Sequence, residues 1–393
     1  MTKTLNNILD KFSQQFLLKL FLLIILNLYE ILALAIKLKY SVTVNEGVLK
    51  MLKISIAGLG LMGKQHLKAI KEHPNCTIAS IIDNTDEAKQ IAKKEGLRFF
   101  SNLSRAIVKS KPDGLIIATP NVSHFENGIL GLESGIPILV EKPISDSLRK
   151  AEKLVKYGEQ VNVPILTGYH RRHNPVVRDI KKKLCSGAIG NLVAMHGMFW
   201  LYKPTDYFNQ VWRKSEGAGP IYINLSHDID LMRHFLGEIE SVQALSSNKT
   251  RGFDVEDTAV AILNFESGIV GSISISDTIV SPWSYELTSN ENPIYHHTTE
   301  NCYWIGGTEG SIELPKGTFW SHKGDKSWWA PITSTSTVNR KSDPIFNQID
   351  NFLNVIQGKQ EPLVSGMEGL KTSAVIDAIK LATVSGAIEK PRF

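Results

Sequence analysis

The sequence predicts an α/β protein with two domains. The first is a Rossmann domain on a doubly wound parallel sheet, and the second is an α+β domain with a large, mostly antiparallel sheet. Three observations predict this: a glycine-rich turn after a short apolar run, apolar runs that alternate with helix-like stretches up to residue 173, and longer alternating runs beyond it. The 393 residues, 42% of them hydrophobic and 21% charged, suit a globular protein of two domains.

The first 50 residues differ in composition from the rest of the chain. Residues 16–36 are strongly apolar, interrupted by Lys19, Asn27 and Glu30, and are compatible with a membrane tether, a poor signal peptide, or a non-native extension ahead of a start at Met51. Glu30 is costly inside a spanning helix. We favour the start at Met51 and a cytoplasmic protein, with a tether through residues 16–36 as the alternative.

The first predicted strand, residues 52–57, leads directly into glycines spaced G-x-G-x-x-G. A strand that turns into a dinucleotide-binding helix has this pattern, although glycine turns also occur without a ligand. Gly58 permits the tight turn, Gly60 lets the backbone approach a pyrophosphate, and Gly63 lets the helix pack close to the strand. The helix start then offers free N–H groups to the phosphates.

A second predicted strand, residues 77–82, ends in Asp83, which follows Gly63 by about 20 residues. An acidic residue at this position suits a ribose 2′-hydroxyl and would repel a 2′-phosphate. The sequence therefore favours NAD over NADP. The alternative is that Asp83 only ends the strand.

The remaining runs of the first domain predict three more strands, with helices between them. In such sheets ligands bind beyond the carboxyl ends of the strands, so the loops after Ala118, Val140 and Leu166 are candidate binding loops. The predicted strands are residues 114–118, 138–140 and 163–166, and the predicted helices are residues 64–71, 85–95 and 148–160.

The loop after Ala118 places a hydroxyl, an amide and an imidazole at a strand end, in Thr119, Asn121 and His124. Pro120 lies between the first two. The alternative is a capped helix start, with Asn121 or Ser123 as the cap.

The predicted strand at residues 138–140 is followed by Glu141, Lys142 and Pro143. Lys142 would reach a substrate oxygen as a cation, and Pro143 would fix the chain so that it does. After the predicted strand at residues 163–166, Tyr169, Arg171 and Arg172 offer hydroxyl and guanidinium groups to a polyhydroxylated or carboxylated substrate. For these three residues the alternative is a hinge between the domains.

Beyond residue 174, long alternating runs predict an antiparallel sheet with a hairpin at Glu266, Ser267 and Gly268. Two helices close the chain, and we expect the last one to pack back on the first domain. The predicted domains are residues 51–173, 174–366 and 367–393, the last being this helix. The predicted strands are residues 192–201, 241–247, 258–265 and 269–279, and the helices are residues 343–357 and 367–388.

Residues 217–237 predict a glycine turn that opens a helix with one apolar and one polar face. Asn224, His227 and Asp228, at spacings of three and four, share the polar face, with Asp230 beyond them. Because His227 lies among polar neighbours, we interpret it as a catalytic base rather than as a structural histidine.

Charge and cysteine usage exclude several functions. A net charge of +5, with basic and acidic residues interleaved, gives no patch for a nucleic-acid partner. Three separated cysteines without a paired spacing favour reduced thiols in an intracellular protein. His296, His297 and Cys302 lack a convincing ligand set, so we expect no metal.

Together these motifs make the chain resemble the glucose-fructose oxidoreductase and inositol dehydrogenase family (Gfo/Idh/MocA). The resemblance runs from Lys53 to about Gly386. The motifs that carry it are Gly58-Leu59-Gly60-Leu61-Met62-Gly63, Ala118-Thr119-Pro120-Asn121, Glu141-Lys142-Pro143, Gly168-Tyr169-His170-Arg171-Arg172 and residues 217–237.

The resemblance implies an NAD(P)-dependent oxidoreductase that transfers a hydride between a nicotinamide and a secondary alcohol of a sugar, cyclitol or related polyol. It also implies a homodimer or homotetramer joined through the open face of the second-domain sheet, with Lys142 and His227 at the reacting carbon. We expect a cofactor, NAD rather than NADP, at Gly58, Gly60, Leu61, Met62, Gly63, Asp83, Thr119, Pro120, Asn121, His124, Glu141 and Lys142. We expect substrate at Tyr169, Arg171, Arg172, Asn224 and Asp228.

The chain departs from the family in one place. Members often carry an acidic residue or an asparagine four positions before the catalytic histidine, where this chain has Ile223. Asp228, Asp230 or Asn224 would replace the missing group, or the chemistry would be altered.

In the mechanism that we expect, neutral His227 takes the hydroxyl proton while Lys142 steadies the developing oxyanion. Two other functions stay open. One is an enzyme that retains NAD and uses transient oxidation for elimination or hydrolysis. The other is a non-catalytic NAD-binding sensor or partner subunit, which Ile223 makes conceivable.

Overall fold

The computed structural model describes residues 51–215, 217–336 and 342–393. The apolar segment at residues 16–36, predicted as a tether or a signal, lies outside the described residues. Within the described part of the chain, no helix combines the length and the apolar character needed to cross a membrane.

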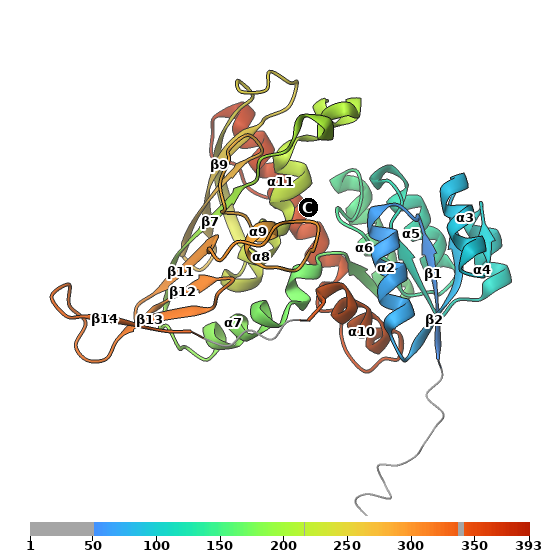
Figure 1. Ribbon diagram of the computed structural model, residues 1–393, viewed down its shortest axis with the longest axis horizontal. Coiled ribbons are helices and arrows are strands. Elements are labelled where there is room, and N and C mark those ends of the chain that lie inside the picture. Colours follow the sequence, from blue (N-terminus) through green and yellow to red (C-terminus); the bar gives the residue numbers. More distant parts are fainter. Residues whose placement is uncertain (1–50, 216, 337–341) are drawn as a thin grey trace, which may run out of the picture. The chain divides into compact units, whose positions relative to one another are not determined.

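Two sheets organise the described residues (Figure 1). The first is parallel with the strand order β3-β2-β1-β4-β5-β6, which is the order of a dinucleotide-binding Rossmann domain. Its strands are β1 (Leu52–Ala57), β2 (Cys76–Ile82), β3 (Phe99–Phe100), β4 (Gly114–Ile117), β5 (Ile138–Val140) and β6 (Ile165–Thr167). The sequence did not predict β3, a strand of only 2 residues. The predicted parallel sheet is confirmed.

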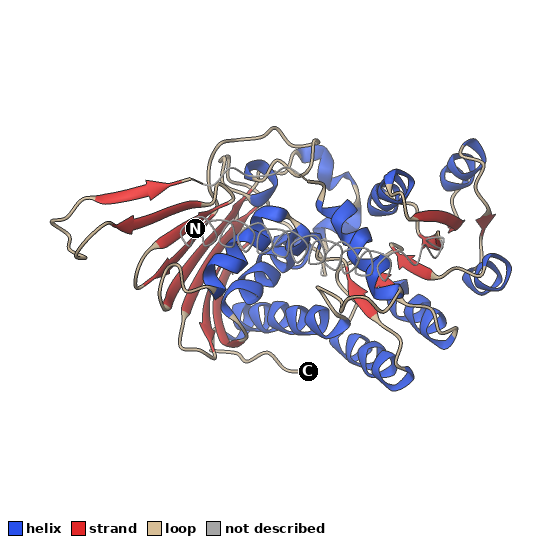
Figure 2. Ribbon diagram, turned by 90° about the horizontal axis from the view of Figure 1, so that it is seen from below, coloured by secondary structure: helices blue, strands red, loops and turns tan. Residues whose placement is uncertain are grey.

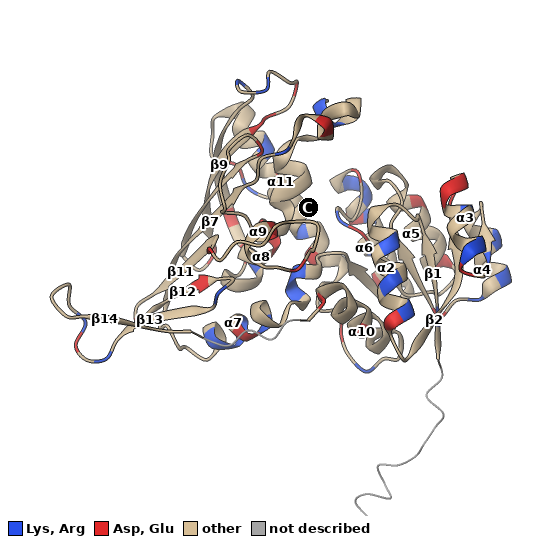
Figure 3. Cartoon of the chain, in the orientation of Figure 1, with Lys and Arg blue, Asp and Glu red and all other residues tan. Residues whose placement is uncertain are grey.

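The central strands of this sheet are buried because they are almost wholly apolar, and helices cover both of its faces. Thr85 and Asn102 cap α3 and α4 by accepting hydrogen bonds from backbone N–H groups of the first turn. The helices are α2 (Leu61–Glu72), α3 (Asp86–Lys94), α4 (Leu103–Ser110), α5 (His124–Glu133) and α6 (Leu148–Val161). Figure 3 shows basic residues on α2, α3 and α4, with acidic residues beside them on α2 and α3.

The second sheet has eight strands in the order β14-β13-β12-β11-β7-β10-β9-β8. Only β7 and β10 pair in parallel, and β9 and β10 form the predicted hairpin. The strands are β7 (Leu192–Trp200), β8 (Ile239–Ser247), β9 (Thr258–Phe265), β10 (Val270–Ser276), β11 (Tyr303–Gly307), β12 (Ser311–Leu314), β13 (Thr318–His322) and β14 (Ile332–Thr335). The mostly antiparallel second domain is confirmed, although the sequence did not predict β11 to β14.

The described helices of the second domain cover one face of this sheet and leave its other face open (Figure 2). They are α7 (Pro175–Cys185), α8 (Ser226–Leu236), the short α9 (Tyr285–Thr288) and α11 (Gly366–Ser385). The buried core between helices and sheet includes Ile229, Met232, Phe199, Ile273 and Ile379. Along β9, buried residues alternate with residues on the open face, as a sheet with one covered face requires.

The two last helices pack differently from one another. In α10 (Pro344–Ile356), Ile349 and Phe352 join the buried cluster of β1 and α2, so this helix completes the first core although the predicted boundaries place it in the second domain. In contrast, α11 contacts β8 and α8 of the second domain as well as α6 and β6 of the first. The expected contact of the last helix with the first domain is therefore only part of its packing.

Candidate active site

The turn between β1 and α2 depends on two of its glycines for close packing. Gly58 has a φ of +89°, and a Cβ there would lie 2.4 Å from the carbonyl oxygen of Ala118. A Cβ on Gly63 would lie 2.0 Å from the carbonyl oxygen of Gly58. Neither position has room for a side chain, because both neighbouring atoms belong to the backbone.

The middle glycine keeps a space open instead. A Cβ on Gly60 would meet no atom within 4 Å. Gly60 is also the N-cap of α2, where no described side chain caps the helix and no acidic residue occupies the first turn. The first N–H groups of α2 are therefore available to an anion such as a pyrophosphate.

Asp83 is held in a fixed orientation at the end of β2. Its Oδ2 accepts a hydrogen bond of 2.7 Å from the N–H of Leu59, and its Oδ1 accepts from the N–H and hydroxyl of Thr85 at 2.8 and 2.7 Å. Burial opposes ionisation, but these hydrogen bonds outweigh it and lower the pKa of Asp83. An ionised carboxylate thus stands beside the glycine turn.

These groups line one cavity of about 640 Å³, together with Thr119 and Pro120. The cavity lies beyond the carboxyl ends of the strands, where doubly wound sheets bind nucleotides. An open helix terminus, a glycine with free space and an oriented carboxylate are the features that NAD requires. The residues present therefore fit this cofactor.

Two side chains predicted to contact the cofactor, His124 and Glu141, have polar partners within the protein. The His124 ring is buried, with Nδ1 2.8 Å from the carbonyl oxygen of Pro143 and Nε2 2.8 Å from that of Thr119. Glu141 is buried, with Oε1 2.7 Å from Nε2 of His66 in α2. Burial opposes ionisation of Glu141, but the contact with His66 prevails and lowers its pKa. Both side chains join neighbouring segments, and their role in binding nucleotide stays a prediction.

Lys142 reaches from the first domain to the second. Its Nζ donates a hydrogen bond of 2.9 Å to the carbonyl oxygen of Ile223, in the π-helical turn η5 (Ile221–Leu225) that precedes α8. A π-helical turn leaves a backbone carbonyl free for such a contact. Burial is the largest influence on Lys142 and lowers its pKa. Lys142 lines a cavity of about 600 Å³ that Asn121, Tyr169 and Ile223 also line.

His227 lines a separate cavity of about 340 Å³, the inner cavity, with Leu61, Met62 and Gln65 from the first turns of α2. The ring is 8% exposed, and its Nδ1 has no hydrogen-bond partner among the described residues. Burial, followed by the charge of Lys142, lowers the pKa of His227 well below its usual value. The imidazole is therefore neutral at physiological pH and able to take a proton.

The predicted substrate-binding arginines are committed to buried ion pairs. Arg171 donates to Asp228 at 3.1 Å and to Glu286 at 2.6 Å, while Arg172 donates two hydrogen bonds to Asp230, at 2.9 and 2.8 Å. Of these residues, Arg171 and Glu286 also line the inner cavity. Buried ion pairs of this kind hold both side chains in place, because losing either partner leaves an uncompensated buried charge. The contact of Arg171, Arg172 and Asp228 with substrate stays a prediction.

The three candidates to replace the carboxylate missing at Ile223 all have other partners. Asp228 accepts hydrogen bonds from Arg171 and from the hydroxyl of Tyr303, and burial raises its pKa to about 6. Asp230 pairs with Arg172, and the side-chain oxygen of Asn224 accepts from Nζ of Lys203 at 2.8 Å. None of the three is directed at His227 by these contacts.

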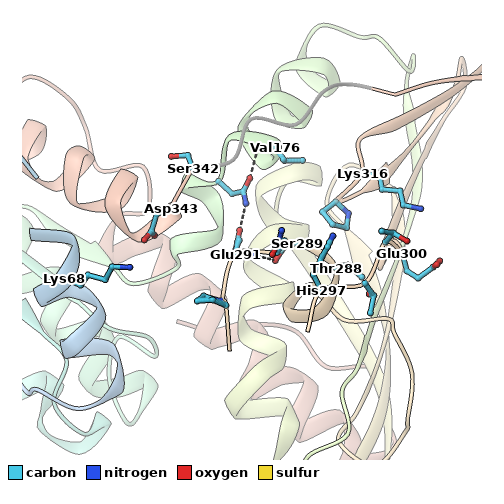
Figure 4. A pocket seen from close by; sticks show the side chains of 16 residues that line it. Lys68, Val176, Thr288, Ser289, Glu291, His297, Glu300, Lys316, Ser342 and Asp343 are labelled. Carbon is cyan, nitrogen blue, oxygen red and sulfur yellow. Dashed lines mark hydrogen bonds between the residues drawn. The ribbon is translucent and has the colours of Figure 1, made fainter. Parts of the chain in front are cut away.

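The sequence patterns did not identify the acidic side chains that line the inner cavity. Tyr285, Glu286 and Glu291 line it together with His170. Tyr285 and Glu286 belong to the short α9, and Glu291 follows it in a segment without regular helix or strand. No sequence pattern therefore identified these three residues. Glu291 also lines a neighbouring outer cavity of about 560 Å³. In Figure 4, Lys68 and Asp343 lie on one side of Glu291, and Lys316 and Glu300 lie on the other.

Within residues 51–215, 217–336 and 342–393, no three His, Cys, Asp or Glu side chains gather as a metal site would require. The groups that converge are those of a cofactor site and a base.

Comparison with known proteins identifies the family. Residues 52–169 match the oxidoreductase family with an NAD-binding Rossmann fold, and residues 177–313 match the GFO/IDH/MocA C-terminal domain. The chain is 27% identical over 271 residues to scyllo-inositol 2-dehydrogenase (NAD(+)) of Bacillus subtilis, which covers 66% of this chain and 72% of that protein. It is 24% identical over 345 residues to D-apiose dehydrogenase of Rhizobium rhizogenes, covering 85% of this chain and 96% of that one.

A solved structure has the same fold. Levoglucosan dehydrogenase, in complex with NADH and levoglucosan, superposes with a TM-score of 0.74 at 21% identity, over 88% of this chain and 100% of that one. Both domains thus match, in sequence and in architecture, one group of proteins. The chain belongs to the Gfo/Idh/MocA family of NAD-binding oxidoreductases.

Proposed function

We propose that this protein oxidises a secondary alcohol of a sugar, cyclitol or related polyol, with NAD as the acceptor. The observation that carries the proposal is the inner cavity, where neutral His227 lies in the same cavity as Leu61 and Met62, from the helix that follows the glycine turn. The relatives named as inositol and apiose dehydrogenases support the substrate class. The test is formation of NADH across a panel of cyclitols, aldoses, sugar acids and nucleotide sugars.

Each residue has a separate task in this reaction. The turn at Gly60 and the carboxylate of Asp83 hold the dinucleotide, which supplies a two-electron acceptor when it is bound. The imidazole of His227 is neutral, because burial and the charge of Lys142 lower its pKa, and it would accept the proton of the substrate hydroxyl. Lys142 lines a different cavity, but its charge acts on His227, and its ammonium group would stabilise the negative charge that develops on the same oxygen.

Replacing Gly60 with alanine should weaken NAD binding about tenfold or more, equivalent to about 1.4 kcal/mol, without lowering the melting temperature. The added methyl meets no protein atom within 4 Å, so it occupies only the space that the ligand needs. Calorimetric titration with NAD and thermal unfolding measure the two quantities.

The matched variant is Gly58→Ala, whose methyl would clash with the backbone of Ala118 and should lower the melting temperature. Unchanged NAD affinity in Gly60→Ala would mean that the pyrophosphate does not approach this turn.

Replacing Asp83 with asparagine should shift the ratio of NAD to NADP affinity towards NADP by about tenfold or more. The substitution removes the charge that repels a 2′-phosphate and keeps an acceptor for the N–H of Leu59. Titrations with both nucleotides measure the ratio.

Asp86→Asn is the control, because it removes the same charge three residues further on, at the exposed start of α3. An equal shift in both variants would reject a specific role for Asp83.

We also propose a cytoplasmic homodimer or homotetramer joined through the open face of the second sheet. That face exposes apolar side chains on adjacent strands, and patches of this kind favour association. The residues are Leu245, Val260, Ile262 and Val270, which are 75%, 47%, 55% and 53% exposed. Sedimentation of the full chain, and of a variant with Ile262 and Val260 changed to lysine, tests this interface.

A further inference from the structure

Two histidines and one carboxylate line the inner cavity beside one another. The ring of His170 lies edge-on to that of His227, with 5.2 Å between the ring centroids. The Nε2 atom of His170 lies 3.9 Å from Oε2 of Glu291. The Nδ1 atoms of both histidines are buried and have no hydrogen-bond partner within the described part of the chain.

Glu291 is oriented so that one oxygen faces His170. Its Oε1 accepts hydrogen bonds from the amide of Asn174 and from the hydroxyl of Tyr285, the second at 2.8 Å. Oε2 is therefore the oxygen left for His170. The side chain is 9% exposed, so its proton equilibrium is governed by these neighbours more than by solvent.

Charged groups from several elements act on Glu291. Burial is the largest influence and raises the pKa of Glu291 to about 7, with Glu286 of α9 adding to the rise and Arg171 opposing it. Lys68 of α2 and Asp343, the N-cap of α10, line the outer cavity with one charge of each sign. More distant groups lining that cavity are His297, Glu300 and Lys316.

Glu291 differs from the other buried acids near His227 in its partners. Asp228 and Glu286 both accept hydrogen bonds from the guanidinium of Arg171, which keeps them in ion pairs. The direct donors to Glu291, from Asn174 and Tyr285, are neutral. Glu291 can therefore gain and lose a proton without breaking an arginine pair.

Glu291 also lines both cavities. A carboxylate that lines both cavities can take up a proton from the buried base of the inner cavity and release it into the outer cavity. The neutral His170 connects them, because an imidazole accepts a proton at one nitrogen and releases the proton of the other. Burial, followed by the charge of Arg171, lowers the pKa of His170 to about 4 and keeps the ring neutral.

We propose that Glu291, acting through His170, receives the proton that His227 removes from the substrate hydroxyl and delivers it to water in the outer cavity. The inference rests on the proposed dehydrogenase function. The alcohol O–H bond breaks as an N–H bond forms on His227, while the hydride leaves the carbon for the nicotinamide. The proton then moves to His170 and to Glu291, across gaps that a side-chain rotation or one bridging water closes.

Glu291→Gln tests the relay, because glutamine keeps an acceptor for Asn174 and Tyr285 but cannot take the proton. In the wild type, kcat for alcohol oxidation should rise with pH through an apparent pKa near 7, since only the ionised carboxylate accepts a proton. In Glu291→Gln that rise should disappear, and kcat above this pKa should fall by about tenfold or more. Glu291→Asp, which retains a carboxyl group, should restore a pH-dependent rate.

Glu300→Gln is the matched control, because it removes the same charge from an exposed residue that lines the outer cavity. Its pH profile should equal that of the wild type. If wild-type enzyme reduces NAD and Glu291→Gln keeps the wild-type profile, the relay is wrong and the dehydrogenase function stands. If no alcohol reduces NAD, the proposed function fails together with the relay.

Infrared difference spectra of the cofactor-free protein give a readout independent of turnover. The intensity of the protonated carboxyl bands that is lost between about pH 5 and about pH 9 should be equal in the wild type and in Glu300→Gln. It should be smaller in Glu291→Gln, where Asp228 still titrates but residue 291 does not. Absence of a Glu291-dependent band over this interval would overturn the proposal.

Discussion

Replacing His227 with alanine should lower kcat by about two to four orders of magnitude while leaving NAD affinity unchanged. In the proposed mechanism the imidazole is the base in the inner cavity, and the nucleotide binds at a different set of groups around Gly60 and Asp83. Alanine removes the base without adding bulk or a buried charge. Steady-state kinetics and calorimetric titration with NAD separate the two effects.

His234→Ala is a suitable control for this substitution. His234 lies on the same helix, α8, but it does not line the inner cavity. Its removal should leave kcat near that of the wild type. A normal kcat in His227→Ala would show that another group takes the proton, and equal losses in both variants would point to damage to α8 instead of loss of a base.

Local sequence patterns predict most strands of the first domain, although not the short β3. The strands β1, β2, β4 and β5 are largely buried apolar runs, and Gly58 and Gly63 must be glycines because backbone atoms occupy the space beside them. The strands β11 to β14 have no comparable signal, since each has only 4 or 5 residues and is recognisable mainly by the neighbours with which it pairs.

Packing partners are harder to predict than elements. The apolar residues of α10 predict a helix with one buried side, and its bounds agree closely with the expected residues 343–357. The pattern does not say which core receives that side. In the structure it is the core of β1 and α2, far earlier in the sequence.

The partners of the site residues were equally hard to predict from the sequence. Sequence reasoning identified Arg171, Arg172, Asp228 and Asp230 as charged groups in suggestive positions. It could not show that they neutralise one another, because each pair joins residues 57 or 58 positions apart. A free side chain and a paired one look alike until the fold brings the partners together.

A change in helix type explains a further difference. The predicted polar face at residues 224–228 assumed a regular helix from the glycine turn onwards. Instead, η5 is π-helical up to Leu225, and the α-helix starts at Ser226. Asn224 consequently contacts Lys203, and the free carbonyl oxygen of Ile223 accepts from Lys142.

Replacing Lys142 with methionine should lower kcat roughly a hundredfold, which corresponds to ~3 kcal/mol of transition-state stabilisation. Methionine fills a similar volume but cannot offer a positive charge to the oxygen that loses its proton. With a substrate deuterated at the reacting carbon, the isotope effect on kcat should increase, because hydride transfer becomes the slow step. These two kinetic measurements, made together, check the prediction.

The hydrogen bond from Lys142 to the carbonyl oxygen of Ile223 provides a second, separable contribution. Its loss should lower the free energy of unfolding by about 1 kcal/mol, since one buried acceptor is left without its donor. Tyr222→Phe is a useful comparison, because it removes the hydrogen bond from the same turn to Asp377 without altering a charge. If that variant slowed turnover as much as Lys142→Met, the ammonium group would matter for joining the domains and not for the chemistry. A large kinetic loss confined to Lys142→Met, with similar stability losses in both variants, would assign the charge to the transition state.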